Sequence, residues 1–423
     1  MKRKIFIFII VSLLLVATAF LKKSFSAVNV NVEKKYSFLD NIQKKANITS
    51  FTIYGRFFNL EGYINENNSD LTLVFKNDDL ETEYSLNLEP TTNKTIFKTN
   101  TLINEGINLE ELKQGEYLLL LKSKKNDKVI YYNLINDTKY KNLEYYTITK
   151  AGKNNKIDIS FANNLNKNLF LSCKEENLPD TYYDIVIDPG HGGKDVVASK
   201  NGYFESKINL NYALKLKESL ENLGLKVKLT REKDISIANY GKNSRTGIPY
   251  ETKAKLMLSV HQNSSVKNVN KGGLEIYIPN HTNKEFASLV VNNIKKYTTS
   301  PISKNTSFKI DEGIYLKTLD KIDLEAIKKE AEKNNYKPYE KATTDSTYYY
   351  MIREVGGIIT NSYIDLRNPN KPGNIYYNSN HGTEAYLLEL GYLNSSSNLK
   401  ILLNEKDEFV KAISFSVKEY LNI

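Results

Sequence analysis

Residues 185–193 read IVIDPGHGG, an apolar run that ends in a histidine flanked by proline and glycine. The β-branched residues favour a buried strand, and Pro189 with Gly190 ends it. His191 then stands just beyond a strand, at the sheet edge where ligands collect in α/β folds. The stretch therefore predicts a sheet whose carboxyl edge carries a functional side chain.

The residues after this stretch complete a strand–helix–strand unit. Residues 182–187 are expected to form the first strand, and residues 207–223 place leucines and alanine on one helical face before Gly224. Residues 225–229 then alternate as a second strand. Such a unit implies parallel strands.

The same α/β pattern continues to the end of the chain. Further strands are expected at 256–260, 274–278 and 385–388, and helices at 284–296 and 407–421. The segment from about 300 to 381 interrupts the pattern and is expected to be an insertion, because plain connections are short. The C-terminal part, 179–423, is thus predicted to be a mostly parallel sheet flanked by helices.

The preceding part, residues 28–178, is predicted to be an all-β accessory domain of immunoglobulin-like sandwich type. Short apolar and aromatic runs alternate there with Asn, Asp, Gly and Lys clusters, the spacing typical of a sandwich or barrel. It is either a binding domain or an inert spacer. The expected strands are 51–58, 71–75, 84–88, 117–121, 129–134, 145–148, 157–161 and 169–171.

Residues 1–27 have the layout of a signal peptide or an N-terminal membrane anchor. Basic residues at positions 2–4 precede an uncharged apolar run, residues 5–21, and two more lysines follow it. The protein is therefore expected outside the cytoplasm, either membrane-anchored or secreted.

The overall composition narrows the classes of partner. The 423 residues carry a net charge of +10, spread along the chain without the basic runs of a nucleic-acid surface. Nucleic acid is therefore not expected, whereas anionic cell-surface polymers or a membrane surface are, with plain solubility as the alternative. The single Cys173 excludes an intramolecular disulfide.

His191, Glu205 and His261 are the predicted metal ligands. Zinc catalysis needs about three nitrogen, sulfur or oxygen ligands and leaves a further position for water. Glu205 opens the helix after His191, and His261 ends the strand 256–260, so all three side chains meet at one edge if the strands are parallel. Taken singly, each has a structural explanation, such as a helix-terminal carboxylate for Glu205.

Glu389 is the predicted catalytic carboxylate. It follows the apolar run 385–388, where a buried charge is costly unless it has a role, and it can act as general acid and base. Asp188 and Asn263 are candidates to position the metal ligands without binding the metal themselves. His281 and His381 lie in polar, loop-like segments and are expected at the surface.

Five motifs in order resemble the zinc-dependent N-acetylmuramoyl-L-alanine amidases of the type-3 amidase family, over roughly residues 182–423. The resemblance implies one zinc ion held by His191, Glu205 and His261, with Glu389 catalytic, and peptidoglycan cut between N-acetylmuramic acid and L-alanine. The motifs are IVIDPGHGGKD (185–195), FESKINLNYALKLKESLENLGLKVKLTREKD (204–234), LSVHQNSS (258–265), GGLEIYI (272–278) and LLELGYLNS (387–395).

Two alternatives remain open, a catalytically silent wall-binding or regulatory module and a zinc peptidase acting on stem peptides. The chain also departs from the family pattern, because the usual Arg-x-x-x-Ala-Asn motif is blurred near Arg245 and the insertion is long. In similar amidases an inserted helix covers the zinc until an activator protein displaces it. The charged run 323–334, with Glu325, Glu330 and Glu332, is a candidate for such a helix, and no substrate-binding residue is assigned.

Overall fold

A computed structural model describes most of the chain beyond residue 42. The described residues are 36, 38, 42–125, 128–135, 142–148, 153–161, 168–195, 199–200, 202–239, 243–264, 272–334, 343–353, 355 and 379–423. The expected signal or anchor, residues 1–27, lies outside them. Within the described ranges, no helix combines the length and apolarity needed to span a bilayer.

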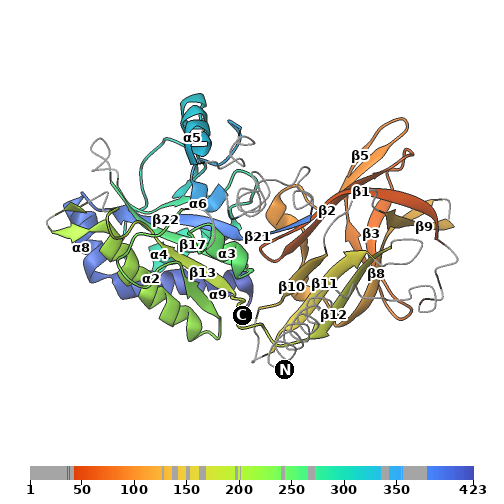
Figure 1. The fold of residues 1–423 in the computed structure, drawn as a ribbon, viewed down its shortest axis with the longest axis horizontal. Coiled ribbons are helices and arrows are strands. Elements are labelled where there is room, and N and C mark those ends of the chain that lie inside the picture. The colour runs from red at the N-terminus through yellow and green to blue at the C-terminus, as the bar shows by residue number, and fades with distance from the viewer. Residues whose placement is uncertain are drawn as a thin grey trace, which may run out of the picture.

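The N-terminal part is built of strands, as the sequence predicts (Figure 1). All of them belong to one hydrogen-bonded network. It branches where β8 pairs with β3, β9 and β12, where β2 pairs with β1, β6 and β7, and where β1 pairs with β2, β9 and the later strand β21 (Ser379–Gly382). A core of interleaved aliphatic and aromatic side chains fills it. The strands are β1 (Ile42–Tyr54), β2 (Phe57–Ile64), β3 (Leu71–Lys76), β4 (Glu81–Ser85), β5 (Asn87–Pro90), β6 (Thr95–Lys98), β7 (Ile107–Asn108), β8 (Gly115–Lys125), β9 (Lys128–Ile135), β10 (Leu143–Tyr146), β11 (Asn155–Phe161) and β12 (Leu169–Glu175).

One predicted strand, 51–58, is in fact a hairpin. β1 ends at Tyr54 and β2 begins at Phe57, so Gly55 and Arg56 form a tight turn within the apolar run. Gly55 has a φ of 58°, a backbone conformation that glycine adopts without steric cost. The sequence does not reveal this turn because the residues on both sides of it are equally apolar. Hydrophobicity alone therefore predicts one continuous strand.

The C-terminal part contains a seven-stranded sheet in the order β16-β13-β17-β22-β18-β20-β19. The first four strands are parallel, and β18 is antiparallel to β22. The predicted mostly parallel α/β fold is therefore confirmed. The strands are β13 (Ile185–Pro189), β16 (Val227–Leu229), β17 (Leu256–Asn263), β18 (Glu275–Tyr277), β19 (Lys309–Asp311), β20 (Ile314–Tyr315) and β22 (Glu384–Tyr392), with a separate short hairpin of β14 (Ser199–Lys200) and β15 (Tyr203–Phe204).

Helices cover both faces of this sheet (Figure 1). α2 (Glu205–Glu221), α4 (Glu285–Tyr297) and α9 (Lys406–Leu421) pack on one face, against alternate strand residues. The intervening residues, such as Val186 and Met257, face α3 (Gly247–Glu251) and α6 (Tyr350–Arg353) on the other. Burial on both faces explains why these strands read as continuous apolar runs.

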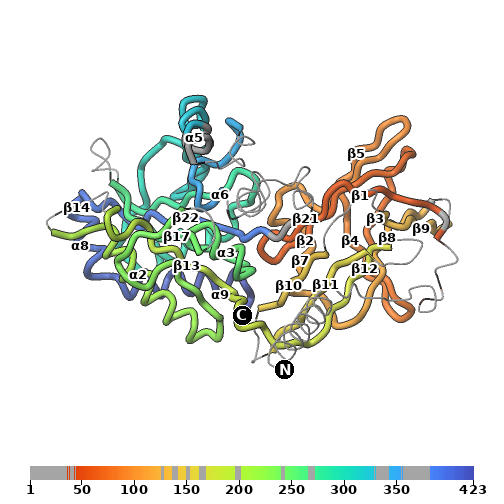
Figure 2. The backbone as a smooth tube through the Cα atoms, in the orientation of Figure 1, coloured from red at the N-terminus to blue at the C-terminus, as the bar shows by residue number. Residues whose placement is uncertain are grey.

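The stretch 300–381, expected as an insertion, contributes to both sheets. It supplies β19 and β20 to the edge of the seven-stranded sheet, and α5 (Lys321–Asn334) stands away from that sheet (Figure 2). β21 (Ser379–Gly382) leaves the α/β part and pairs in parallel with β1. α8 (Ser396–Asn404) follows β22.

The hairpin turn at Gly55 joins the two parts of the chain. The backbone N–H of Gly55 donates to the carbonyl of Gly382 at 2.9 Å. The guanidinium of Arg56 donates to the carbonyl of Tyr420 at 2.5 Å. The buried carboxylate of Glu384, the first residue of β22, accepts hydrogen bonds from Asn104 at 3.0 Å and Tyr420 at 2.7 Å. The predicted boundary near residue 178 falls between β12 and β13, although contacts of this kind cross it.

This contact predicts a position-specific effect of adding one methyl group. A Cβ at Gly55 would lie 3.0 Å from the Cβ of Glu384 and 3.0 Å from the carbonyl of Lys255, whereas Gly224, also at positive φ, has open space around it. Gly224→Ala should cost about 1 kcal/mol of backbone strain. Gly55→Ala should cost about 3 kcal/mol, because steric overlap adds to the same strain. Urea unfolding of both variants measures the difference, and equal losses would argue against a tight contact at Gly55.

Candidate functional site

His191 follows β13 in an unusual backbone conformation. Its φ is 59°, in the left-handed region that non-glycine residues seldom adopt. Its Nδ1 lies 3.0 Å from a carboxylate oxygen of Asp195, and its Nε2 lies 3.2 Å from Oε1 of Glu205. Asp195 thus fixes the ring so that Nε2 faces Glu205, the arrangement by which carboxylates orient metal-binding histidines.

Arg245 holds the strained loop from behind. Its guanidinium is almost fully buried and donates to the carboxylate of Asp188 at 2.6 Å, to the carbonyl of Pro189 at 2.9 Å and to the carbonyl of His191. The loop carbonyls therefore have partners despite their burial. The sequence places Arg245 in a blurred family motif but gives it no role.

A second buried arginine, Arg231, supports the same loop from the end of β16. It donates to the carbonyls of Pro189 at 3.0 Å, Gly190 at 2.9 Å and Ser206 at 2.8 Å. Because Ser206 lies in the first turn of α2, Arg231 fixes the position of that turn relative to the loop. The available signal is the motif at 204–234, which contains Arg231 but does not indicate what it contacts.

Glu205 and His261 meet His191 at the carboxyl edge of the sheet. Glu205 is the first residue of α2, and His261 lies in β17, which runs parallel to β13 as predicted. Nδ1 of His261 is 3.3 Å from Oε1 of Glu205. Potential ligand atoms of these three residues all lie within 4.8 Å of one another. The structure thus brings together all three side chains predicted as ligands.

The group fits a metal ion. Nε2 of His261 is buried and has no hydrogen-bond partner among the described residues. A buried polar atom without a partner is rare in native proteins, and binding a metal would satisfy it. Two imidazole nitrogens and one carboxylate oxygen are also a donor set that zinc accepts.

Gly190 is the residue that lets the His261 ring approach the loop. A Cβ built on Gly190 would lie 2.2 Å from Cε1 and 2.3 Å from Nε2 of that imidazole. No side chain can therefore be accommodated there while His261 keeps its position.

Glu389 lies on the neighbouring strand, β22. It is paired with His261 in the parallel ladder and with Glu275 in the antiparallel one. It is 9% exposed, and its Oε2 has no hydrogen-bond partner within the described part of the chain. Burial raises the pKa of Glu389 well above its usual range, and the charges of Glu205 and Glu275 raise it further.

Glu275 is a fully buried carboxylate to which the sequence assigns no role. Its oxygens accept hydrogen bonds from Ser303 at 2.6 Å, Tyr392 at 2.7 Å, Tyr277 at 2.8 Å and Asn263 at 3.0 Å. Asn263, a candidate supporting residue, thus contacts Glu275, which is the neighbour of Glu389 in the antiparallel ladder. The available signal is the motif GGLEIYI, which contains Glu275.

Asp188, the other candidate supporting residue, lies beneath the site. Its carboxylate accepts from Thr230 at 2.6 Å and Ser259 at 2.8 Å as well as from Arg245. Burial alone would raise the pKa of Asp188, but the Arg245 charge and these hydrogen bonds outweigh it and lower the pKa. Asp188 is therefore ionised and ties β13 to β17.

The charges in the group favour a charged Glu205. Burial acts to raise the pKa of Glu205, but contacts with His191 and His261 lower it strongly. Burial likewise acts to lower the pKa of His191, and Glu205 and Asp195 raise it overall. A charged Glu205 between two imidazoles is the state in which a carboxylate coordinates a cation.

The other histidines are not part of this group. The sequence predicts a surface position for His281, which is only partly right: the residue is half-buried, its ring packs against Tyr54 with centroids 5.8 Å apart, and burial lowers its pKa to about 4. Its exposure is reduced because the end of β1 packs against the polar loop that carries it. The side chain of His381 lies outside the described residues.

The helix proposed to cover the metal is α5. Glu325 on this helix is exposed and is not part of the His191, Glu205 and His261 group. The side chains of Glu330 and Glu332 lie outside those that the structure describes.

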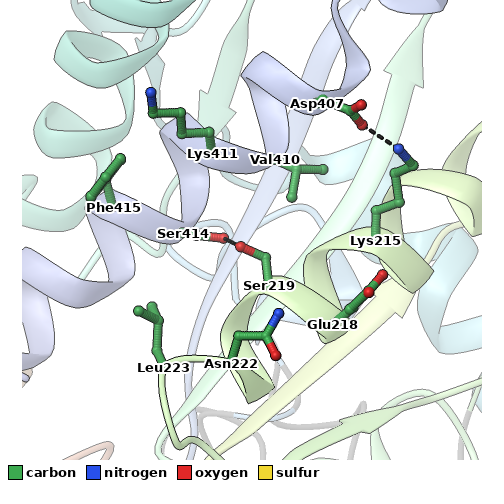
Figure 3. A pocket seen from close by; sticks show the side chains of 10 residues that line it. All are labelled: Lys215, Glu218, Ser219, Asn222, Leu223, Asp407, Val410, Lys411, Ser414 and Phe415. Carbon is green, nitrogen blue, oxygen red and sulfur yellow. Dashed lines mark hydrogen bonds and ion pairs between the residues drawn. The ribbon is translucent and has the colours of Figure 1, made fainter.

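A hollow of about 380 Å³ lies between α2 and α9, away from these residues (Figure 3). Lys215, on its rim, is ten residues along α2 from Glu205, a distance of about 15 Å along a helix axis. An ion pair between Lys215 and Asp407 and a hydrogen bond of 2.8 Å between Ser414 and Ser219 bridge the two helices there. The hollow contains none of the predicted site residues.

Comparison with known protein families matches residues 185–419 to the family described as N-acetylmuramoyl-L-alanine amidase. The probable cell wall amidase LytH of Staphylococcus aureus is 34% identical over 110 residues, which are 25% of this chain and 34% of that protein. The LytH of Staphylococcus saprophyticus is 33% identical over 115 residues, 26% of this chain and 36% of that protein. The chain thus spans about a third of the length of these curated relatives.

Solved structures of similar proteins include the amidase AmiC2 of Nostoc punctiforme, at 21% identity and a TM-score of 0.38, covering 57% of this chain and 98% of that one. Cwp6 from Clostridium difficile is 23% identical with a TM-score of 0.37, covering 56% of this chain and 29% of that one.

The close approach of Gly190 to His261 predicts that Gly190→Ala loses its metal. The added methyl group would displace the imidazole and remove one ligand. Metal content after reconstitution with Zn2+ and gel filtration should fall well below that of the wild type, whereas Gly224→Ala should retain it. Full metal content in Gly190→Ala would contradict the placement of His261.

Substitution of Arg245 should separate its two roles. Arg245→Met leaves Asp188 buried without a cation and should destabilise the fold by about 3–5 kcal/mol. Arg245→Lys restores the charge but not the fork of donors to the loop carbonyls, so stability should recover more than metal affinity. Chemical unfolding and competition with a chelator measure the two effects. Metal affinity that recovers fully in the lysine variant would show that the loop does not need Arg245.

Proposed function

This chain belongs to the N-acetylmuramoyl-L-alanine amidase family, and on that premise we propose that it hydrolyses the amide bond between N-acetylmuramic acid and L-alanine of the peptidoglycan stem peptide. The observation that carries the proposal is the convergence of His191, Glu205, His261 and Glu389 at one edge of the sheet, within the matched segment. These four residues come from four different segments of the chain. Residues with purely structural roles would have no reason to meet at one point.

His191, Glu205 and His261 would hold one zinc ion. When bound, zinc supplies a Lewis acid that polarises the substrate carbonyl and lowers the pKa of water toward neutrality. The partnerless Nε2 of His261 and the Asp195 contact of His191 support this assignment. The ionised Glu205 adds a negative charge that favours a cation over a neutral ligand.

Glu389 would move the proton. Its free Oε2 is able to accept a proton from the attacking water as the water oxygen bonds to the amide carbon. The same carboxyl group then donates that proton to the nitrogen of L-alanine as the carbon–nitrogen bond breaks. Burial acts to raise the pKa of Glu389 and so helps it hold the proton between these steps.

The supporting residues keep these groups in place. Asp195 orients His191, Arg231 and Arg245 hold the loop between β13 and α2, and Glu275 lies beside Glu389 in the ladder. Positioning of this kind contributes to catalysis because small displacements of reacting groups cost large factors in rate.

The protein would act outside the cytoplasm, where peptidoglycan is found, in remodelling of the cell wall. Residues 1–27 would direct export and either anchor the chain or be removed. The β-rich part, residues 28–178, would serve as an accessory domain, and the net charge of +10 favours contact with anionic wall polymers or the membrane surface. Control of the site by an activator protein belongs to the same proposal.

Digestion of purified peptidoglycan tests the reaction. The chain without residues 1–27, loaded with Zn2+, should release free stem peptides that begin with L-alanine, identified by mass spectrometry. Glu389→Gln should lower the rate at least about a hundredfold, because the proton acceptor is lost, while retaining its zinc. Glu221→Gln, at the far end of α2, is the matched control and should cleave normally. Cleavage at another bond of the stem peptide would instead identify a peptidase.

A further inference from the structure

Ile235, in the segment that follows β16, is an exposed apolar residue beside the loop that follows β13. Its side chain is 49% exposed, although the residues before and after it are both bound to that loop. The carboxylate of Asp234 accepts the backbone N–H of Gly193 at 3.0 Å, and the hydroxyl of Ser236 donates to the carbonyl of Gly192 at 2.9 Å. The isoleucine side chain is therefore held in one place while it remains open to solvent.

Glycines in the loop allow this segment to approach the metal ligand His191. A Cβ on Gly192 would lie 2.4 Å from the carbonyl oxygen of Ile235, and a Cβ on Gly193 would lie 2.5 Å from the backbone nitrogen of Ser236. The two backbones thus pack directly against each other, which only glycine permits. Because Gly192 follows His191 in the chain, Ile235 lies beside the first predicted ligand at the carboxyl edge of the sheet.

The strand order places Ile235 and Glu389 on opposite sides of the metal ligands. The sheet runs β16-β13-β17-β22, and β13, β17 and β22 follow one another in Figure 1. Ile235 follows β16, and His191 follows β13. His261 lies in β17, and Glu389 lies in β22. Neighbouring strands are roughly 4.7–4.9 Å apart, so a substrate lying across this edge spans from Glu389 over the ligands toward Ile235.

The proposed reaction fixes which half of the substrate lies on which side. Glu389 gives its proton to the nitrogen of L-alanine, so this nitrogen has to be within hydrogen-bond reach of Glu389. The stem peptide therefore extends on the Glu389 side. The acyl half, the lactyl group with its sugar, lies on the other side, over the loop of His191. Only the lactyl linker separates the sugar ring from the scissile carbonyl, which brings the ring next to Ile235.

We propose that Ile235 forms an apolar subsite for the N-acetylmuramic acid ring of the substrate. The proposal rests on the proposed amidase function and names the part of the substrate recognised on the side away from Glu389. A sugar ring presents C–H groups and an N-acetyl methyl group, and covering them with isoleucine removes apolar surface from water. Because the neighbours of Ile235 already fix its position, little conformational entropy is lost on binding.

Binding to an inactive variant tests the subsite without cleavage. The ligands are N-acetylmuramoyl tripeptide and lactoyl tripeptide, which share the lactyl–L-alanine amide and differ only in the sugar. In zinc-loaded Glu389→Gln protein, added Ile235→Ser should raise the Kd for the muramoyl ligand about tenfold, because apolar contact with the sugar is lost. The Kd for the lactoyl ligand should not change. Ile235→Val should keep most of the affinity for the muramoyl ligand. Isothermal titration calorimetry measures all of these values.

Kinetics and a matched control complete the test. With Glu389 intact, Ile235→Ser should lower kcat/KM for the muramoyl tripeptide about tenfold while its zinc content equals that of the wild type. Ile310→Ser is the control, because Ile310 is also 49% exposed but lies on β19, at the opposite edge of the sheet. It should bind and cleave as the wild type does.

The outcomes separate the subsite from the reaction. An unchanged Kd for the muramoyl ligand in Ile235→Ser, or an equal loss with both ligands, would overturn the subsite and leave the amidase function standing. Loss of zinc from Ile235→Ser would assign the residue to support of the loop and would also overturn the subsite. Failure of the wild type to cleave the muramoyl tripeptide before L-alanine would overturn the proposed function and the subsite with it.

Discussion

The carboxylate of Asp188 joins the segments that have to meet for the site to exist. It is fully buried and accepts hydrogen bonds from Thr230 after β16, Ser259 in β17 and Arg245 before α3. Burial removes hydration free energy from a carboxylate, on the order of several kcal/mol, so a buried aspartate is stable only when it has such partners. Because Arg245 also binds the carbonyl of His191, the same cluster sets the loop that carries the first predicted ligand.

Parallel strands then bring the remaining groups to the same edge. β13, β17 and β22 lie side by side, so the residues at their carboxyl ends share one side of the sheet. This is why His191, Glu205 and His261 were predictable as a group, and Glu389 with them, from the ends of apolar runs and the first turn of a helix. The sheet and the helices that flank it follow from the same hydrophobic pattern.

What the sequence does not show is how distant side chains support these groups. Arg231 and Glu275 act on segments far along the chain or on another strand, and no local pattern marks a buried carbonyl that needs a donor. The turn at Gly55 and the burial of His281 are missed for a related reason. Both arise where the β-rich part packs against the α/β part, and hydrophobic periodicity describes one element at a time.

The 300–381 stretch contributes strands to both parts of the chain. It supplies β19 and β20 to the edge of the seven-stranded sheet, and it supplies β21, which pairs with β1 of the β-rich part. Glu384 begins β22 in contact with Asn104 of the β-rich part, five residues before Glu389. The β-rich part and the strand that carries the candidate catalytic carboxylate are therefore in direct contact.

X-ray absorption spectroscopy of the zinc-loaded protein shows whether His191, Glu205 and His261 bind one zinc ion. We predict one zinc per chain with imidazole scattering from two histidines and nitrogen or oxygen ligands at about 2.0–2.2 Å. The imidazole signal should fall by half in a variant that lacks either histidine. A spectrum without imidazole scattering, or one that is unchanged when His191 or His261 is replaced by alanine, would contradict it.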